Sequence, residues 1–380
     1  MRLNDFNIST TAFVAIIFFL FLLLPPHDLQ HVSVSERKDF LRKASIWHKM
    51  NIPSANLLLG PQSEISVTPE AEVSCVYVEE PPSRVGFSPK FRCRLLDSGE
   101  VVRIKFSNRE TVAEVAGSRL LWALGFYTDD VYSVQLRCFG CPEKNPAHPG
   151  KNEARVERLI TDAMMERTYN GSEIVQYSDQ GWSWKELEAI RAESSPEKKT
   201  EIDALKLVAA LMQHTDSKRS QQRLGCDSSN LIWSNGFPDC TESRLMIQDL
   251  GETFGEGSST IDTLSAMYFK GWSQTPVWSQ DRENEERKKN ASMRMCFANL
   301  KSAGNDGLFD PAISDEGRMF LGNLLEKLSD QQIHDLFKAS RADTTGEKIV
   351  KNGVLVSVTL NDWVSAFKKK RQEIVERRCD

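Results

Sequence analysis

The sequence lacks the compositional biases that mark fibrous, disordered or nucleic-acid-coating chains. Its 380 residues include 21 Gly and 15 Pro, too few for collagen-like or low-complexity character. Positive charge is not in excess either, because 48 Lys and Arg face 53 Asp and Glu for a net charge of -5, so we expect no nucleic-acid partner. With 40% hydrophobic and 27% charged residues, the chain can bury one large core or two smaller ones.

The N-terminus has one long hydrophobic run but no clear cleavage signal after it. Residues 12–24, AFVAIIFFLFLLL, are uncharged and end at Pro25 and Pro26, and no A-x-A pattern follows. The run is short for a helix that must cross about 30 Å of hydrocarbon, although residues 8–11 extend it. We therefore predict a signal peptide or membrane anchor over residues 1–35. An uncleaved anchor that holds the rest outside the cytoplasm is favoured, with cleavage or a cytoplasmic orientation as alternatives.

The following residues predict a linker and then a compact β-rich region. Residues 36–70 are interpreted as a juxtamembrane linker, and the folded domain is expected to begin at Ala71. Alternating apolar and β-branched residues predict a three-strand meander, a helix that Gly125 terminates, and a further strand. These elements are strands 74–80, 91–96 and 101–106, a helix that begins at Asn108, and a strand over 131–136.

The second half of the sequence is mostly helical by periodicity. An apolar stripe predicts a helix over 202–212, and Ser314 and Ser329 are expected as helix N-caps, the latter in a capping box with Gln332. A short β-like pair, 223–226 and 244–249, interrupts the helices, and a last helix follows Trp363. These patterns together predict an α+β fold.

Two short motifs lie where the predicted helices meet this β-like pair. Residues 214–221 are HTDSKRSQ, and Asp249-Leu250-Gly251 follows the second strand. The first motif resembles the catalytic loop of protein kinases, and the second resembles their D-F-G element with Leu in place of Phe. The chain from Ala71 to about Ala342 therefore resembles the protein-kinase-like superfamily, in an atypical form similar to HipA-type or secretory-pathway kinases.

This resemblance implies a bilobal fold and an ATP-dependent phosphotransferase. It implies a small β-rich N-lobe over 71–137 and a larger, mostly helical C-lobe over 138–380, behind the N-terminal anchor. The expected cofactors are ATP with Mg²⁺ or Mn²⁺, and the acceptor is a protein, a sugar or a lipid.

The resemblance also assigns a role to individual residues. Asp249 would bind the metal that bridges the phosphates, Asp216 would orient the acceptor hydroxyl, and Lys218 would offset charge on the transferring group. Lys105 in the third strand would hold the non-transferred phosphates and pair with a helix carboxylate. Glu114 is the expected partner, with Glu110, one turn earlier, as the alternate. His214 is expected to support the loop by packing.

The loop between the first two strands contains one Gly instead of the three found in ordinary protein kinases. SRVGFSPKF resembles the phosphate loop of HipA-type kinases, which implies that Gly86 and Ser88 present backbone N–H groups to phosphate with Lys90 nearby. An ordinary hairpin loop is the alternative.

One position departs from the kinase pattern. Kinases have Asn at the second metal position, whereas this sequence has Gln221, whose extra methylene moves the amide oxygen by about 1.5 Å. A pseudokinase scaffold therefore remains an alternative. A second alternative is a disulfide-stapled extracytoplasmic binding protein in which the two motifs are accidental.

The eight cysteines favour disulfides if the domain is extracytoplasmic. Cys226 and Cys240 flank the segment between the two motifs and are expected to pair, as are Cys75 and Cys93 on adjacent predicted strands. The C-x-x-C at residues 138–141 is interpreted first as a local disulfide. A redox pair, or half of a zinc site with His148, is the alternative, and a reducing compartment would leave all eight as buried thiols.

Overall fold

The computed structural model describes most of the chain beyond the N-terminus. The described residues are 34–61, 67–79, 88–106, 109–150, 152–167, 169, 171–173, 181–234, 237–256, 265–290, 295–302 and 306–379. The hydrophobic run at 12–24, on which the predicted anchor rests, lies outside these ranges. Within them, no helix is both long enough and apolar enough to cross a membrane. The protein is a mixed α and β structure.

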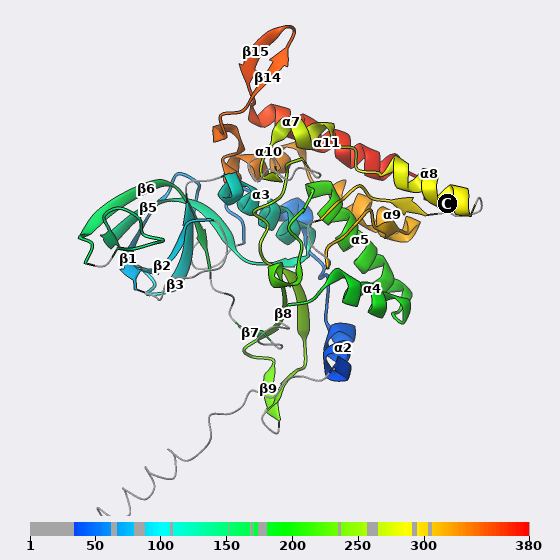
Figure 1. Cartoon of the computed structure of the whole chain (residues 1–380), viewed down its shortest axis with the longest axis horizontal. Helices are drawn as coiled ribbons and strands as arrows, with labels where there is room; N and C mark the ends of the chain where they lie inside the picture. The colour runs from blue at the N-terminus through cyan, green and yellow to red at the C-terminus, as the bar shows by residue number, and fades with distance from the viewer. Residues whose placement is uncertain are drawn as a thin grey trace, which may run out of the picture.

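A closed five-stranded barrel forms one side of the molecule (Figure 1). In order around the barrel, the strands are β1 (Glu72–Val78), β2 (Lys90–Leu95), β3 (Val101–Phe106), β6 (Arg155–Glu166) and β5 (Val131–Pro142). The predicted meander is present, since β1–β2 and β2–β3 are antiparallel hairpin pairs, and the parallel pairing of β1 with β5 closes the barrel. Alternate residues of each strand fill the interior, as Phe91, Cys93 and Leu95 do in β2.

The barrel extends further along the chain than the sequence predicts. The expected boundary at residue 137 falls inside β5, and β6 then adds a strand that reaches Glu166. Charged residues dominate the first half of β6, which hides its alternation from a search for apolar periodicity. Its last four residues, 163–166, are all buried.

Helix α3 (Arg109–Leu124) connects the barrel to the helical part, since it packs against β5, β6 and α10 (Asp330–Ser340). The helix ends at Gly125 as predicted, and a side chain there is excluded, because a Cβ would lie 2.2 Å from the His48 carbonyl oxygen and φ is +90°.

The rest of the chain is mainly helical, with small sheets between the helices. The remaining helices are α2 (Val34–Lys43), α4 (Trp184–Ala192), α5 (Pro196–Met212), α7 (Phe269–Gln274), α8 (Gln280–Lys289), α9 (Asp315–Leu325) and α11 (Leu360–Glu376), with 3₁₀ turns η1 (Ile52–Ser54), η3 (Arg219–Gln221) and η4 (Ala342–Thr344). The predicted caps are confirmed: Ser314 caps α9, and Ser329 and Gln332 form a capping box on α10. Apart from α8, whose residues are all polar, these helices share one large core with α3.

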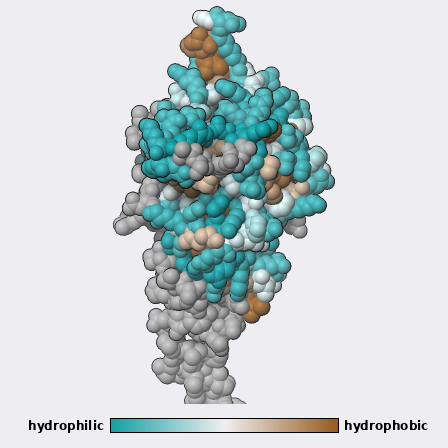
Figure 2. Space-filling view, turned by 90° about the vertical axis from the view of Figure 1, so that its right-hand side faces the viewer, coloured by the Kyte–Doolittle hydropathy of each residue, from teal (hydrophilic) through white to brown (hydrophobic). Residues whose placement is uncertain are grey.

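One sheet lies beside the predicted loops and positions them. Its order is β4 (Tyr127–Thr128), β11 (Ser243–Ile247), β8 (Gln222–Asp227) and β7 (Gly171–Glu173). Three hairpin-like pairs complete the strands: β9 (Leu231–Ser234) with β10 (Phe237–Cys240), β12 (Cys296–Phe297) with β13 (Ala312–Ile313), and β14 (Lys348–Lys351) with β15 (Val354–Ser357). The β14–β15 hairpin projects from the body (Figure 1), and its exposed Val350, Val354 and Leu355 form the brown patch at the top of Figure 2.

The segment 36–70 is not a linker along its whole length, which corrects the expectation. Leu41 and Ile46 are 2% and 1% exposed and belong to the main core. The side chain of Arg37 in α2 bonds Glu186 in α4, and the backbone of Ser45 bonds β11. Apolar residues spaced along an otherwise polar segment thus anchor it to the folded domain.

All eight cysteines form disulfides, and three of the four pairs are those expected. The Cα–Cα distances are 5.7 Å for Cys75–Cys93, 5.8 Å for Cys138–Cys141 and 6.0 Å for Cys226–Cys240. Because Cys138 and Cys141 bond each other, neither thiolate is available for zinc. The fourth pair, Cys296–Cys379 at 5.1 Å, was not predicted because 83 residues separate its members and neither lies in a local motif.

Non-reducing peptide mapping is expected to recover these four pairs. Removing Cys296–Cys379 with two serines should lower the free energy of unfolding by about 4 kcal/mol, because that bond closes an 83-residue loop in the unfolded chain. Removing Cys138–Cys141 in the same way is the control, and should cost less because the loop is short. Denaturant unfolding measures both, and recovery of Cys296 or Cys379 as a free thiol would contradict the assignment.

Candidate functional site

A buried ion pair joins the barrel to helix α3. Val102 and Ile104 fill the barrel interior, so their neighbour Lys105 points to the outer face of β3, where α3 lies. The Lys105 Nζ is 2.8 and 2.7 Å from the two carboxylate oxygens of Glu114. Both residues are buried, with 5% and 1% exposure. The ion pair expected for Lys105 is present, and its partner is Glu114 and not the alternate, Glu110.

Two further carboxylates face the Lys105 ammonium. Its Nζ is 3.7 Å from Asp249 Oδ1 and 4.0 Å from Glu166 Oε2. Burial acts to lower the pKa of Lys105, but the charges of Glu114, Asp249 and Glu166 outweigh it and raise the pKa above its usual value. Lys105 therefore stays cationic. Glu166, which also pairs with Arg103 at 2.6 Å, was missed because strand β6 was not predicted.

The Asp249-Leu250-Gly251 segment packs directly on α3. Leu250 is fully buried, and its Cβ lies 3.0 Å from the place where a side chain on Gly117 would begin. The Thr253 hydroxyl donates to the Ala113 carbonyl at 3.3 Å. The helix that carries Glu114 and the segment that carries Asp249 are therefore held in one arrangement, which brings both carboxylates to Lys105.

Asp249 is positioned as an ionised oxygen ligand. Its side chain is 39% exposed, so one side of the carboxylate faces solvent. Burial acts to raise the pKa of Asp249, but the Lys105 ammonium and the Gly251 N–H outweigh it and hold the pKa below its usual value.

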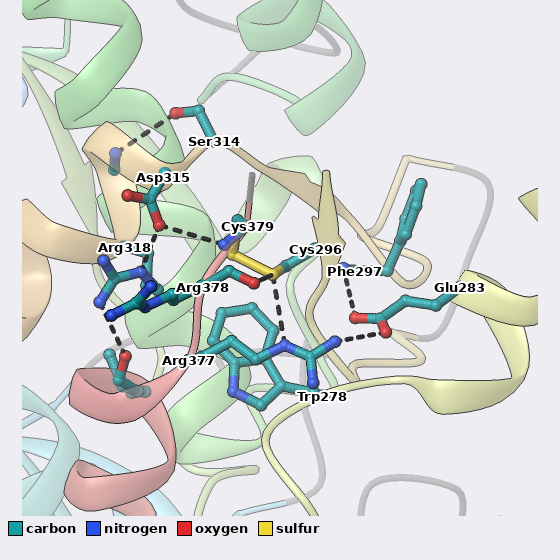
Figure 3. Close-up of a disulfide and its surroundings, with 12 residues drawn as sticks. Trp278, Glu283, Cys296, Phe297, Ser314, Asp315, Arg318, Arg377, Arg378 and Cys379 are labelled. Carbon is teal, nitrogen blue, oxygen red and sulfur yellow. Dashed lines mark hydrogen bonds and ion pairs between the residues drawn. A yellow bond between two sulfur atoms is a disulfide. The ribbon is translucent and has the colours of Figure 1, made fainter. Parts of the chain in front are cut away.

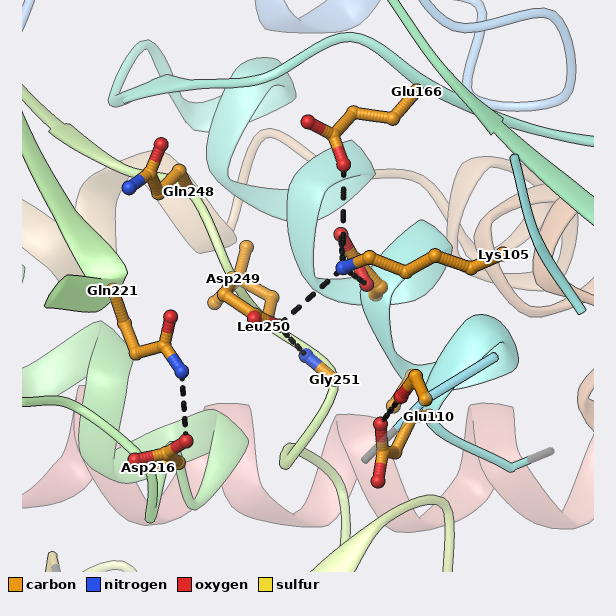
Figure 4. Close-up of polar contacts among 12 residues, drawn as sticks. Lys105, Glu110, Glu166, Asp216, Gln221, Gln248, Asp249, Leu250 and Gly251 are labelled. Atoms are coloured by element: carbon orange, nitrogen blue, oxygen red, sulfur yellow. Dashed lines mark hydrogen bonds and ion pairs between the residues drawn. The ribbon is translucent and has the colours of Figure 1, made fainter. Parts of the chain in front are cut away.

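The catalytic-type loop presents Asp216 beside this segment (Figure 4). The Asp216 Oδ2 accepts a hydrogen bond from Lys218 Nζ at 2.8 Å and another from Gln221 Nε2 at 2.8 Å. Gln221 ends the 3₁₀ turn η3, and its carbonyl accepts from the Gln248 N–H at 3.1 Å. This backbone bond links the loop to the residue just before Asp249.

His214 lies beneath the loop and is completely buried. Burial lowers the pKa of His214 to about 4, although the negative charges of Asp216 and Asp249 act to raise it. The imidazole is therefore neutral at physiological pH. The Thr215 N–H that follows donates to the Glu252 carbonyl at 3.2 Å, so this end of the loop is also fixed to the Asp249 segment.

The expected phosphate loop is described only in part. Gly86 lies outside the described residues. Ser88 donates its hydroxyl to the carboxylate of Glu110, and Lys90 is the cross-strand neighbour of Lys105. Directly opposite residues point to the same face of a sheet, so Lys90 and Lys105 lie on one face. Burial, followed by the charge of Lys105, lowers the pKa of Lys90.

Together these groups offer the parts that phosphoryl transfer requires. Lys90 and Lys105 supply cations from adjacent strands, Asp249 supplies an anionic oxygen, and Asp216 lies on the neighbouring loop. Gln221 bonds Asp216 through its amide nitrogen, which leaves the amide oxygen as the atom that suits a metal. Carboxylate and amide oxygens are the ligands that Mg²⁺ and Mn²⁺ prefer, so Asp249 and Gln221 fit such an ion.

Comparison with known proteins gives only remote likenesses. No family model matches the chain, and no curated protein matches it. A proinflammatory kinase of Helicobacter pylori, CtkA, is 10% identical with a TM-score of 0.38, over 79% of this chain and 94% of that one. HipA of Shewanella oneidensis MR-1, solved with HipB and operator DNA, is 13% identical with a TM-score of 0.31, over 94% of this chain and 73% of that one. Likenesses at these TM-scores assign neither a fold nor an activity.

The burial of His214 predicts a pH-dependent loss of stability. The unfolded state takes up a proton near pH 6.5 and the folded state only near pH 4, so this contribution is complete above pH 6.5 and is lost as the pH falls to 4. The loss attributable to His214 should be about 3 kcal/mol. Denaturant unfolding of wild type and His214→Gln between pH 7 and pH 4 gives the free energy of unfolding at each pH. The contribution of His214 is the difference between the two proteins in how steeply this free energy falls as the pH is lowered.

His148→Ala is the matched control, since His148 is exposed. That variant should retain the wild-type dependence on pH. A His214→Gln slope equal to that of wild type would show that the imidazole is not held neutral.

Proposed function

We propose that this protein is an atypical ATP-dependent phosphotransferase that uses Mg²⁺ or Mn²⁺. The observation that carries the proposal is the convergence of residues distant in sequence around one cation. Lys105 binds Glu114 at 2.7 Å and approaches Asp249 at 3.7 Å, while the loop with Asp216 bonds the residue before Asp249. A lysine, a helix glutamate, a loop aspartate and a metal-binding aspartate, in that chain order, are the parts of a kinase-like site.

The geometry suggests a division of work among these side chains. Lys90 and Lys105 would bind the phosphates of ATP, and Asp249 and Gln221 would hold the divalent ion, which offsets phosphate charge when bound. In the reaction, the bond from the γ-phosphorus to the β-bridging oxygen breaks and a bond from the acceptor oxygen to the γ-phosphorus forms. ADP leaves, and the hydroxyl proton passes to Asp216 or through it to solvent.

The two hydrogen bonds at Asp216 support an orienting role for it. Lys218 and Gln221 both donate to Oδ2, so Oδ1 is the oxygen that would meet the acceptor hydroxyl. Lys218, with a side chain 51% exposed, is also placed to reach the transferred phosphoryl group.

The alternative of a binding protein in which the two motifs are accidental explains less well why the loop with Asp216 and the segment with Asp249 pack together. Leu250 fills the space over Gly117, Thr253 bonds Ala113, and Gln248 bonds Gln221. Accidental motifs have no reason to pack on each other and on the helix that carries Glu114. A pseudokinase is the stronger second candidate, because Gln221 replaces the usual Asn and its amide group is already engaged by Asp216.

We also propose that the enzyme works outside the cytoplasm, on a membrane anchor or secreted. The uncharged run at residues 12–24 and the four disulfides support this, because structural disulfides persist in oxidising compartments.

Substituting the two aspartates separates nucleotide binding from transfer. Asp249→Asn should weaken metal-dependent ATP binding at least tenfold, because a neutral amide replaces the metal carboxylate. Asp216→Asn should leave ATP affinity nearly unchanged while transfer falls by two orders of magnitude or more. Calorimetry or thermal shift measures binding, where ATP at 100 times its dissociation constant adds about 2.7 kcal/mol of stability.

The same measurements decide between the candidates. ATP binding without transfer in the wild type would favour the pseudokinase, and recovery of transfer in Gln221→Asn would assign the defect to the second metal position. Absence of ATP binding with either metal would overturn the phosphotransferase proposal.

A further inference from the structure

We propose that a polar cavity beside the catalytic-type loop is the acceptor site, and that the acceptor is a sugar hydroxyl and not a peptide side chain. This inference rests on the phosphotransferase function proposed above. The cavity has a volume of about 530 Å³, within the range of small-molecule sites. Its lining comes from four places in the chain. These are Gln213 at the end of α5, Glu256 in the segment after Asp249, residues in and around α7 from Tyr268 to Pro276, and the pair Asn299 and Lys301.

The cavity wall is bonded to the loop that carries Asp216. Gln213, three residues before Asp216, lines the cavity and donates its amide N–H to the Asn299 carbonyl at 2.6 Å. Ser302 donates to the His214 carbonyl at 3.2 Å and accepts from the Ser217 hydroxyl at 2.8 Å. The cavity therefore adjoins, through Gln213, the loop that carries Asp216, and Asp216 itself is not among the lining residues.

Unusual backbone conformations concentrate around this cavity. Among the described residues, four of the seven non-glycine residues with positive φ are Gln213 at 56°, Phe254 at 56°, Met267 at 42° and Asp310 at 39°. Gln213 lines the cavity, and Phe254 and Met267 lie close in sequence to its wall residues Glu256 and Tyr268. The Asp310 carboxylate accepts from the Leu300 N–H at 3.2 Å, between two further wall residues. Such conformations are costly for these side chains and cluster at functional sites.

A glycine lets two polar wall residues approach each other. A Cβ on Gly271 would lie 2.7 Å from the Glu256 Cβ and 2.7 Å from the Tyr268 ring. Any larger residue would push the carboxylate-bearing and phenol-bearing side chains apart. Gly271 therefore leaves the space that these two polar side chains occupy in the wall.

The chemistry of the lining favours a polyhydroxylated ligand. Amide, ammonium and carboxylate groups dominate it: Gln213, Gln274, Asn299, Lys270, Lys301 and Glu256. The apolar surfaces in the lining are Pro276 and the ring of Tyr268. Such a lining does not suit the apolar side chains that flank an acceptor hydroxyl in a peptide, because a pocket for them would be lined mainly by apolar groups. Sugar hydroxyls both donate and accept hydrogen bonds, so they can pair with amides, ammonium groups and a carboxylate in the same space.

The end of the chain holds two walls of the cavity in place. In α11, Lys370 donates to the Thr275 carbonyl, and the Glu373 carboxylate accepts from the Val277 N–H at 3.0 Å. The Cys296–Cys379 disulfide ties the end of the chain to β12, which leads into residues 299–301 (Figure 3). The site is thus preorganised, and a preorganised site loses less entropy on binding.

The full chain, in detergent or lipid nanodiscs, is to be assayed with γ-labelled ATP and Mg²⁺ or Mn²⁺. The acceptors are p-nitrophenyl glycosides of hexoses, N-acetylhexosamines, pentoses and hexuronic acids, and a peptide library containing Ser, Thr and Tyr. We expect label on at least one glycoside and none on the peptides. Lys270→Ala and Asn299→Ala should each raise the KM for that glycoside at least fivefold and leave the Kd for ATP unchanged.

Two further variants sharpen the assignment. Lys288→Ala, on the exposed face of α8, should change neither the KM for the glycoside nor the Kd for ATP. The double change Cys296→Ser with Cys379→Ser should raise the glycoside KM while the ATP Kd stays within twofold of wild type.

The outcomes separate this inference from the function on which it rests. Transfer to peptides alone, transfer to no acceptor despite ATP binding, or a glycoside KM unaffected by Lys270→Ala and Asn299→Ala would each overturn the sugar-acceptor site. Absence of ATP binding would instead overturn the phosphotransferase function, and this inference with it.

Discussion

The site depends on one buried ammonium group and the carboxylates that surround it. An unpaired cation buried at Lys105 would be strongly destabilising, so its partners must be in place whenever the protein is folded. Those partners come from three different elements: Glu114 from α3, Glu166 from β6 and Asp249 from the segment after β11. The barrel, the helix and the loop are therefore positioned relative to one another by the same group that would hold the phosphates.

The Cys226–Cys240 disulfide reinforces a connection that carries no site residue itself. Cys226–Cys240 joins β8 to the end of β10, and these strands lie between Gln221 and Asp249 in the chain. The bond fixes the connection between the two motifs, while the ladder of β8 with β11 brings their ends together. This local cross-link thus holds the scaffold and leaves the residues around Lys105 to be assembled by charge and packing.

Short-range patterns predicted much of this arrangement, and distant contacts account for what was missed. Alternation predicted β2 and β3, a glycine predicted the end of α3, and the two motifs indicated Asp216 and Asp249. Glu166 escaped because charged residues interrupt the apolar pattern of its strand, and because it reaches Lys105 only through the fold. The packed segment 36–57 and the Cys296–Cys379 bond escaped for the same reason, since their partners lie 62 or more residues away.

The replacement of Asn by Gln at position 221 affects two tasks in different ways. The Gln221 amide nitrogen bonds Asp216 Oδ2, to which Lys218 also donates, so the longer side chain still orients the loop aspartate. The proposed phosphoryl transfer would depend mainly on positioning and charge stabilisation and only a little on a strong base, and these two hydrogen bonds would supply the positioning. The second metal position is more demanding, because divalent ions of this size accept little change in ligand placement. Under the proposed function, the consequence of having Gln221 in place of Asn would therefore fall on the metal, and not on the aspartate that would meet the acceptor.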